Sequence, residues 1–197
     1  LAIMKMQPTQ LQQFLDAFCA IADRAKPQEV ANTLWAVATM KHQIQPLQLQ
    51  QLLDVFCVIA DRAKPQEIAN TIWAVATMEQ QIQPVQLQQL IHALCAMADE
   101  AQPQHLKDAI WAVATMKQQI QPTQLQQLLS AFCAVADRAK PQHIANAIWA
   151  VATMKQQMQP TQLQQLLDAF CAIADRAQPQ AIANTLWAVA TMKHQIE

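Results

Sequence analysis

The chain contains no glycine and few charged residues, and both shortages narrow its structure. Of its 197 residues, 14% are charged and 53% are hydrophobic. Glycine is the residue that most easily adopts a left-handed backbone conformation. We therefore expect turns that need no left-handed glycine cap. The hydrophobic content is ample for a buried core.

Long apolar runs and an excess of positive charge are also missing. No stretch of 18 uncharged apolar residues occurs, and residues 1–4 are too few for a signal peptide or membrane span. We expect no membrane insertion. The net charge of −1 lacks the basic balance that marks many nucleic-acid-binding proteins. A nucleic-acid function therefore needs support from other features.

No C-x-x-C motif or paired His/Cys spacing is present, so we expect no metal site and no cofactor. The five cysteines recur once every 38 residues, too far apart for disulfides, and we predict that they are small buried hydrophobes suited to a reducing compartment. The histidines form no ligand set. The two sets are Cys19, Cys57, Cys95, Cys133 and Cys171, and His42, His92, His105, His143 and His194.

A repeat of 38 residues runs through the whole chain. Tryptophan marks it at Trp35, Trp73, Trp111, Trp149 and Trp187. The copies span 8–45, 46–83, 84–121, 122–159 and 160–197, and residues 1–7 match the tail of a preceding copy. Each copy carries two prolines nineteen residues apart, and proline is favoured at the first position of a helix. We predict an all-α chain: one domain over 1–197, a right-handed α-solenoid of five two-helix repeats, with helices of about 16 to 18 residues.

Helical periodicity separates a buried and an exposed face in each predicted helix. The first helix gathers Leu11, Leu15 and Phe18 on one face. The second gathers Leu34 and Trp35, so we expect the tryptophans to point into the core. Its opposite face carries short side chains that suit the inside of a curve, and we expect the second helices to line a concave groove.

Neither end of the array has a polar capping helix, which natural solenoids normally carry. We therefore expect both terminal repeats to expose apolar side surfaces. The chain is typical of a segment of a longer array, and end-to-end self-association of copies is an expected consequence.

The candidate binding residues lie on the predicted concave face of the second helices. A near-constant amide ladder, able to donate and accept hydrogen bonds, stands beside a pair of positions that change together. The ladder is Asn32, Asn70, Asp108, Asn146 and Asn184, and the pairs are Glu29/Thr33, Glu67/Thr71, His105/Ala109, His143/Ala147 and Ala181/Thr185. This pattern is typical of a repeat protein that contacts one unit of a polymer per repeat. The alternative is that the amides bond the neighbouring backbone and that the pairs are neutral variation.

Basic residues recur along the edges of the array and suit phosphate contacts. Aspartates beside the arginines partly cancel them, so a solvated charged edge is the alternative. The basic residues are Arg24 with Lys26, Arg62 with Lys64, and Arg138 with Lys140 on one edge, and Lys41, Lys117, Lys155 and Lys193 on the other.

The third copy departs most from the others, at Glu79, His92, Glu100, His105, Lys107 and Asp108. These residues belong to different faces and ends of two helices, so we predict no enzymatic activity and attribute them to drift.

The segments 27–40 and 179–192 share the motif Pro-Gln-x-x-Ala-Asn-Thr-Leu-Trp-Ala-Val-Ala-Thr-Met. This motif and the 38-residue period resemble the octotricopeptide repeat (OPR) family. The resemblance covers essentially the whole chain. It implies sequence-specific binding of single-stranded RNA, about one nucleotide per repeat, in transcript stabilisation, processing or translation. It also implies an organellar (chloroplast or mitochondrial) or bacterial setting, including secreted effectors. Lys107-Asp108-Ala109 departs from the motif, which places the RNA contact of that repeat in doubt.

A peptide- or protein-binding scaffold of armadillo-like type is the rival reading. An asparagine ladder on a concave helical surface can also hold an extended polypeptide, and the near-neutral charge favours this rival.

Overall fold

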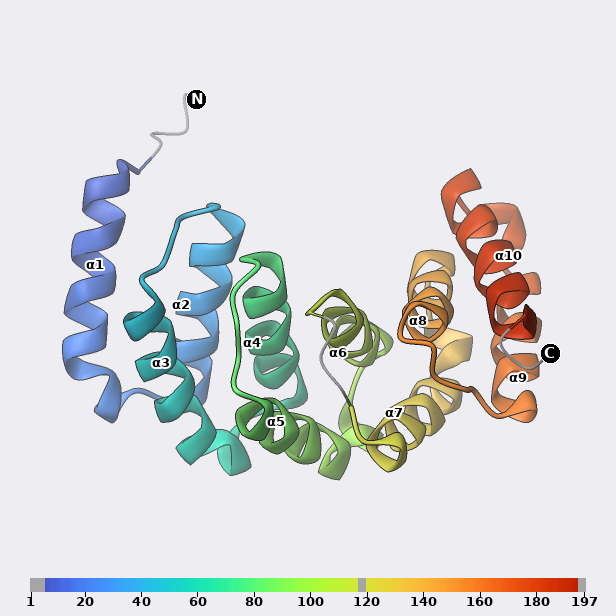
Figure 1. Ribbon diagram of the computed structural model, residues 1–197, viewed down its shortest axis with the longest axis horizontal. Coiled ribbons are helices and arrows are strands. Elements are labelled where there is room, and N and C mark those ends of the chain that lie inside the picture. Colours follow the sequence, from blue (N-terminus) through green and yellow to red (C-terminus); the bar gives the residue numbers. More distant parts are fainter. Residues whose placement is uncertain (1–5, 117–119, 195–197) are drawn as a thin grey trace.

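The computed structural model describes residues 6–116 and 120–194, and within these ranges the chain is all-helical, without strands. Ten α-helices pack in neighbouring pairs (Figure 1). Their bounds are α1 Pro8–Ile21, α2 Pro27–Thr39, α3 Pro46–Ile59, α4 Pro65–Thr77, α5 Pro84–Ala96, α6 Pro103–Met116, α7 Pro122–Ala134, α8 Pro141–Thr153, α9 Pro160–Cys171 and α10 Pro179–His194.

Every one of these helices begins at a proline, as predicted. The residue before the proline is extended, for example Gln7 at φ −73° and ψ 143°, because the proline ring disfavours helical geometry there. Nine of the ten helices described are shorter than expected, down to 12 residues in α9, whereas α10 has 16 residues and meets the expectation. A three-residue 3₁₀ turn, such as Ala22–Arg24, follows each odd-numbered helix and takes up the difference.

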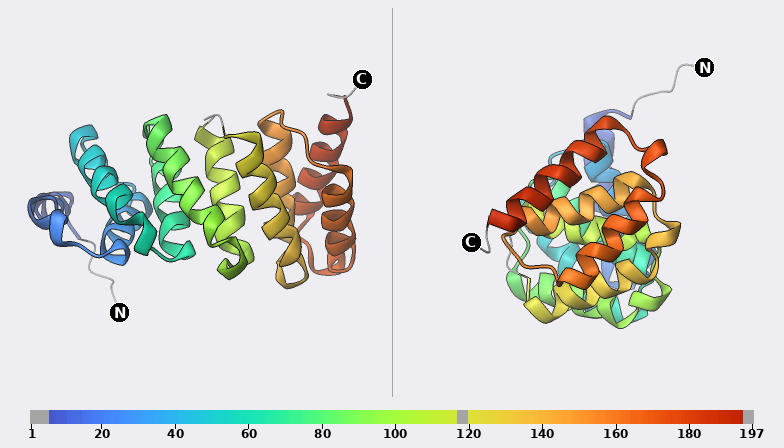
Figure 2. Two further views of the ribbon diagram at one scale, coloured as in Figure 1. Left: turned by 90° about the horizontal axis from the view of Figure 1, so that it is seen from below. Right: turned by 90° about the vertical axis from the view of Figure 1, so that its right-hand side faces the viewer.

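The helices form two curved layers (Figures 1 and 2). The even-numbered helices α2, α4, α6, α8 and α10 lie side by side on the inside of the curve, and the odd-numbered helices lie outside. Each even-numbered helix packs closely on the next, whereas successive odd-numbered helices make much less contact. The second helix of each predicted repeat therefore faces the concave side.

Small side chains on both flanks of the inner helices explain the close inner packing. In α4, Ala69 and Ala76 are buried on one flank, and Ala74 and Thr71 are buried on the other. The distance between packed helices depends on the side chains at their contact. Alanine-lined flanks therefore bring the inner helices close, while the outer helices, which carry leucine, phenylalanine and glutamine, spread apart.

Glutamines connect the outer helices across the repeat boundaries. The side-chain amide of Gln51 donates to the backbone carbonyl of Cys19 at 2.8 Å, and Gln89 makes the same bond to Cys57 at 2.8 Å. Gln48 also donates to the carboxylate of Asp16 at 2.7 Å. These neutral side chains satisfy backbone and carboxylate groups without adding charge, which accounts for a layer rich in glutamine.

The turns form without a glycine cap, as expected, yet three of the described turns are left-handed. Lys41, Glu79 and Lys155 have φ of 53°, 55° and 54°, directly after the C-caps of α2, α4 and α8. Around Lys41, the amide of His42 donates to Val37 at 3.1 Å and that of Lys41 donates to Ala38 at 3.0 Å. This is the Schellman pattern, which satisfies the last carbonyls of a helix and normally uses glycine. The chain adopts it with lysine or glutamate.

We expect Lys41→Gly, Glu79→Gly and Lys155→Gly each to stabilise the fold by about 0.5–1 kcal/mol. A left-handed residue with a Cβ costs roughly 1–2 kcal/mol, and part of the gain is lost to the greater freedom of glycine in the unfolded chain. Urea unfolding of each variant measures the change. Lys193→Gly is the matched control, because the backbone of α10 is still helical at that position, and there glycine should bring no gain in stability. A destabilised Glu79→Gly variant would contradict this explanation.

Both ends of the array expose apolar side chains that are buried elsewhere in it. Leu186 is 67% exposed, although its counterparts Leu34, Ile72, Ile110 and Ile148 are fully buried. Phe14 is 63% exposed, while the leucines in its column are buried. At each internal boundary the neighbouring repeat covers these faces, the preceding one in the Phe14 column and the following one in the Leu186 column. End-to-end association of copies through them stays a prediction.

Candidate functional site

Four columns of side chains run across the inner helices on the face opposite their buried side. In α4 they are Gln66, Asn70, Trp73 and Thr77, spaced four, three and four residues apart, which places all four on one face of a helix. None of these four is buried. We name the equivalent residues of the five inner helices the concave stripe. Its members are Gln28, Asn32, Trp35 and Thr39; Gln66, Asn70, Trp73 and Thr77; Gln104, Asp108, Trp111 and Thr115; Gln142, Asn146, Trp149 and Thr153; and Gln180, Asn184, Trp187 and Thr191.

The prediction that the tryptophans point into the core requires correction. Trp35 is 45% exposed and Trp187 is 50% exposed. Trp73, Trp111 and Trp149 pack against the core but remain half-buried. The sequence did hold the signal, because each tryptophan follows a ladder asparagine or aspartate by three residues and so shares its face. The prediction failed because it assumed that a large aromatic side chain belongs to the core.

The amide ladder lies within reach of solvent in four of its five positions. Asn32 is exposed, Asn70, Asn146 and Asn184 are half-buried, and Asp108 is buried. The side-chain oxygen of Asn146 accepts a bond of 2.8 Å from the amide of Gln142, one turn earlier in the concave stripe. The ladder therefore presents hydrogen-bonding groups on the concave side.

The first member of each variable pair also has a local structural role. The carboxylates of Glu29 and Glu67 accept the backbone amides of Lys26 and Lys64 at 2.8 Å and 2.9 Å, which caps the start of α2 and α4. His105 and His143 accept the amides of Gln102 and Lys140 through Nδ1, at 3.2 Å and 3.4 Å. Glutamate and histidine side chains thus cap the starts of their helices in the same way. Ala181, in the last repeat, has no group for such a cap and is buried.

The second member of each pair lies between neighbouring inner helices. Thr71, Ala109, Ala147 and Thr185 are buried, and Thr33 is half-buried. The threonine hydroxyls donate to the carbonyl four residues earlier, Thr71 to Glu67 at 2.9 Å and Thr185 to Ala181 at 2.8 Å. Thr185 is covered although α10 is the last helix in the described residues, so this column faces the preceding inner helix. A direct contact with a ligand is thus open to the first member of the pair in the first four repeats, but not to the buried Ala181.

The third repeat places charges between α6 and α8. Lys107 stands where the other copies have a small alanine, and it forms an ion pair with Asp108; both side chains are largely buried. Helices α6 and α8 make less contact than the other inner neighbours, as expected when a lysine replaces alanine at the boundary. Burial lowers the pKa of His143, and the charges of Lys107 and Lys140 lower it further. Burial likewise lowers the pKa of His105, against the attraction of Asp108.

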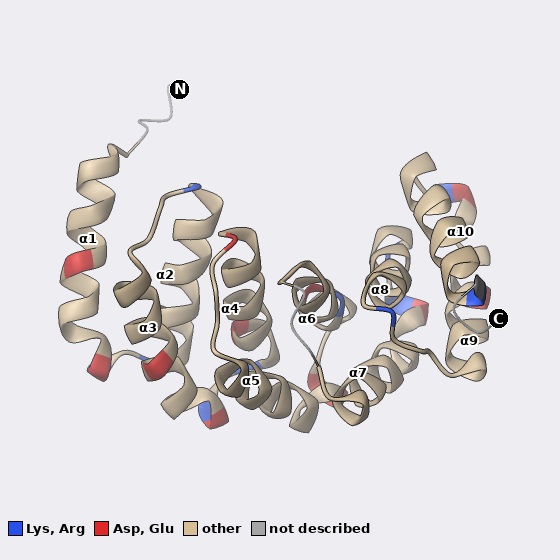
Figure 3. Ribbon diagram, in the orientation of Figure 1, with Lys and Arg blue, Asp and Glu red and all other residues tan. Residues whose placement is uncertain are grey.

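Basic residues gather in the short connections that lead into the inner helices (Figure 3). Arg24, Arg62, Arg138 and Arg176 belong to the 3₁₀ turns. Arg62 and Arg176 each lie near the preceding aspartate, at 3.9 Å and 4.0 Å, with all four side chains well exposed. On the other edge, Lys41, Lys155 and Lys193 are exposed, and Lys117 lies outside the described residues.

The cysteines follow the predicted buried position in three repeats but not in all. Cys19, Cys57 and Cys133 are buried, Cys95 is half-buried, and Cys171, in the last outer helix of the described residues, is exposed. Burial raises the pKa of Cys57, Cys95 and Cys133 to about 11, so these thiols stay protonated at neutral pH. Among residues 6–116 and 120–194, no group of three His, Cys, Asp or Glu side chains is placed to hold a metal ion.

No helix in the described part of the chain combines the length and hydropathy needed to cross a bilayer. Comparison with known proteins adds no family: no family model matches this sequence, and no curated protein matches it.

Proposed function

We propose that the chain is a right-handed α-solenoid of five repeats of the octotricopeptide kind, and that its concave stripe binds single-stranded RNA, about one nucleotide per repeat. In this role it would act in transcript stabilisation, processing or translation. The observation that carries the proposal is the concave stripe, which pairs an accessible aromatic ring with a hydrogen-bonding side chain in each repeat.

The two columns have complementary chemistry toward RNA. Sequence-specific recognition of RNA uses unstacked bases that stack on aromatic side chains and form hydrogen bonds through their edges. Trp73 offers a ring face and Asn70 offers a donor and an acceptor one turn away. Neighbouring helices pack about 8–10 Å apart, a spacing that an extended RNA strand can follow.

The residues proposed to set base choice are the accessible first members of the variable pairs, Glu29, Glu67, His105 and His143. They lie one turn before the amide ladder. The buried partners, such as Thr71 and Ala147, act indirectly by setting how closely adjacent inner helices pack. Asp108 is buried and ion-paired with Lys107, and a carboxylate cannot donate when ionised, so the third repeat differs from the others in what it offers a base.

A peptide-binding scaffold is the second candidate, and the near-neutral net charge favours it. An asparagine ladder can hold a polypeptide backbone, and exposed tryptophan can hold apolar side chains.

Crosslinking to a random pool of single-stranded RNA, followed by sequencing of the bound fraction, tests the proposal. We expect enrichment of a short motif about five nucleotides long, and an affinity that falls steeply with salt, because phosphate contacts release counterions. A scaffold that holds peptides through hydrogen bonds from asparagine amides would show neither an enriched RNA motif nor a steep dependence on salt. Absence of RNA retention at low salt would overturn the proposal.

A further inference from the structure

We infer that two basic grooves, at the boundary between the first two repeats and at the boundary between the last two, hold the phosphates of the bound strand, and that the third repeat interrupts this contact. This inference rests on the proposed function, because it assigns the backbone side of the same RNA site.

The first groove lies between the connections that lead into α2 and α4. Its cations are Arg24, Lys26, Arg62 and Lys64, and its carboxylates are Asp23 and Glu67. The carboxylate of Glu67 is already engaged as an acceptor for the amide of Lys64. Positive charge therefore exceeds negative charge in a groove of about 450 Å³.

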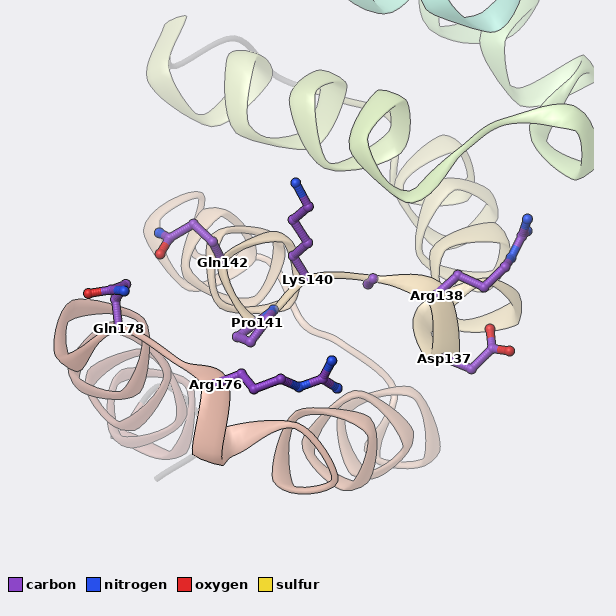
Figure 4. A pocket seen from close by; sticks show the side chains of 8 residues that line it. Asp137, Arg138, Lys140, Pro141, Gln142, Arg176 and Gln178 are labelled. Atoms are coloured by element: carbon purple, nitrogen blue, oxygen red, sulfur yellow. The ribbon is translucent and has the colours of Figure 1, made fainter.

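The second groove is its counterpart between the connections that lead into α8 and α10, with a volume of about 490 Å³. Arg138, Lys140 and Arg176 line it, with Asp137 as its one carboxylate among the lining residues. In Figure 4 the side chain of Arg176 extends past Pro141 toward the turn that carries Asp137 and Arg138, and Lys140 points away on the other side of that proline. The same backbone geometry thus builds a basic groove at two places three repeats apart.

The third repeat carries no cation at this edge. Glu100 occupies the position of the arginines and Gln102 that of the lysines, in the 3₁₀ turn and at the entry to α6. Glu100 is exposed. A phosphate that followed the edge would meet a carboxylate here, which repels it. The backbone contact is therefore split into two segments.

The grooves stand at the right distance from the concave stripe. Lys26 directly precedes α2, Asn32 lies six residues further and Trp35 nine. At about 1.5 Å per residue, these positions lie about 9 Å and 14 Å along the helix axis from Lys26. A strand that crosses the inner helices near their starts can place its phosphates on the arginines and lysines, and its bases over the asparagines and tryptophans.

Two substitutions that change the net charge by the same amount distinguish phosphate binding at this edge from a general effect of charge. Glu100→Arg introduces the arginine that the other repeats carry at the edge with the grooves. Glu79→Lys introduces the lysine that the other repeats carry at the opposite edge. The measurement is the dissociation constant of a random-sequence 10-nucleotide single-stranded RNA between about 50 and 200 mM salt. We expect Glu100→Arg to tighten binding several-fold at low salt and to steepen the slope of log affinity against log salt by about 0.7 for one added phosphate contact. Glu79→Lys should leave the slope within error.

The double variant Arg138→Gln/Arg176→Gln tests the second groove by removing two of its cations. We expect the slope to become shallower by about 1.4, for two phosphate contacts removed. Both arginines lie in exposed turns, and thermal unfolding confirms that the variants remain folded. If the wild type binds RNA but Glu100→Arg and Glu79→Lys act alike, or the double variant keeps the wild-type slope, the groove assignment is wrong and the proposed function stands. If the wild type binds no RNA, both fail.

Discussion

A variant in which Trp73, Trp111 and Trp149 are all replaced by leucine should bind single-stranded RNA about 100-fold more weakly than the wild type. Stacking of a base on an aromatic side chain contributes about 1–3 kcal/mol. Three such contacts at the lower value amount to about 3 kcal/mol, and each 1.4 kcal/mol is tenfold in affinity. Fluorescence anisotropy of a labelled RNA at fixed salt measures the change.

The matched control replaces the same three tryptophans by phenylalanine, which keeps an aromatic ring face. We expect this variant to retain affinity to within about tenfold. Because all three tryptophans also pack against the core, circular dichroism must show that both variants are folded at the temperature of the assay. Equal affinity for the leucine and phenylalanine variants would mean that the tryptophans serve the fold alone.

Leu34→Ala should destabilise the protein by about 2–5 kcal/mol, whereas Leu186→Ala should cost less than about 1 kcal/mol. The two leucines stand in an identical ten-residue context, 31–40 and 183–192. Leu34 is fully buried because α4 packs against α2, while Leu186 is 67% exposed because α10 is the last of the described helices. Truncation of a buried leucine loses its transfer energy and leaves a cavity, and truncation of an exposed one does neither.

Urea unfolding followed by circular dichroism measures both changes. Both positions lie in terminal repeats, so fraying of the ends affects them alike, and the comparison isolates the cover supplied by a neighbouring helix. Similar losses for the two variants would contradict the packing described for the last repeat.

The helical content and the position of every helix start in the described residues followed from the sequence, because proline acts locally on its own φ and on the residue before it. The side on which the second helices lie also followed, from the small size of Asn32 and its neighbours. The left-handed turns at Lys41, Glu79 and Lys155 did not follow, because no glycine marks them and these residues have no intrinsic preference for that conformation.

The candidate site was predicted only in part. The asparagine ladder does lie on the concave side, since residue spacing along a helix fixes relative direction. The exposure of Trp35 and the burial of Thr71 depend on how closely adjacent inner helices approach. That distance is set by Ala69, Ala74 and Ala76 acting together across two boundaries, so it could not be inferred from the periodicity of a single helix.

The most direct measurement of the central claim is the affinity of the wild type for single-stranded RNA oligonucleotides of increasing length, from two to ten nucleotides, followed by quenching of tryptophan fluorescence. If each repeat engages one nucleotide on the concave stripe, affinity and quenching should rise with each added nucleotide and level off near five, the number of tryptophan-bearing inner helices. Binding without quenching, or an affinity that does not depend on length below five nucleotides, would contradict it.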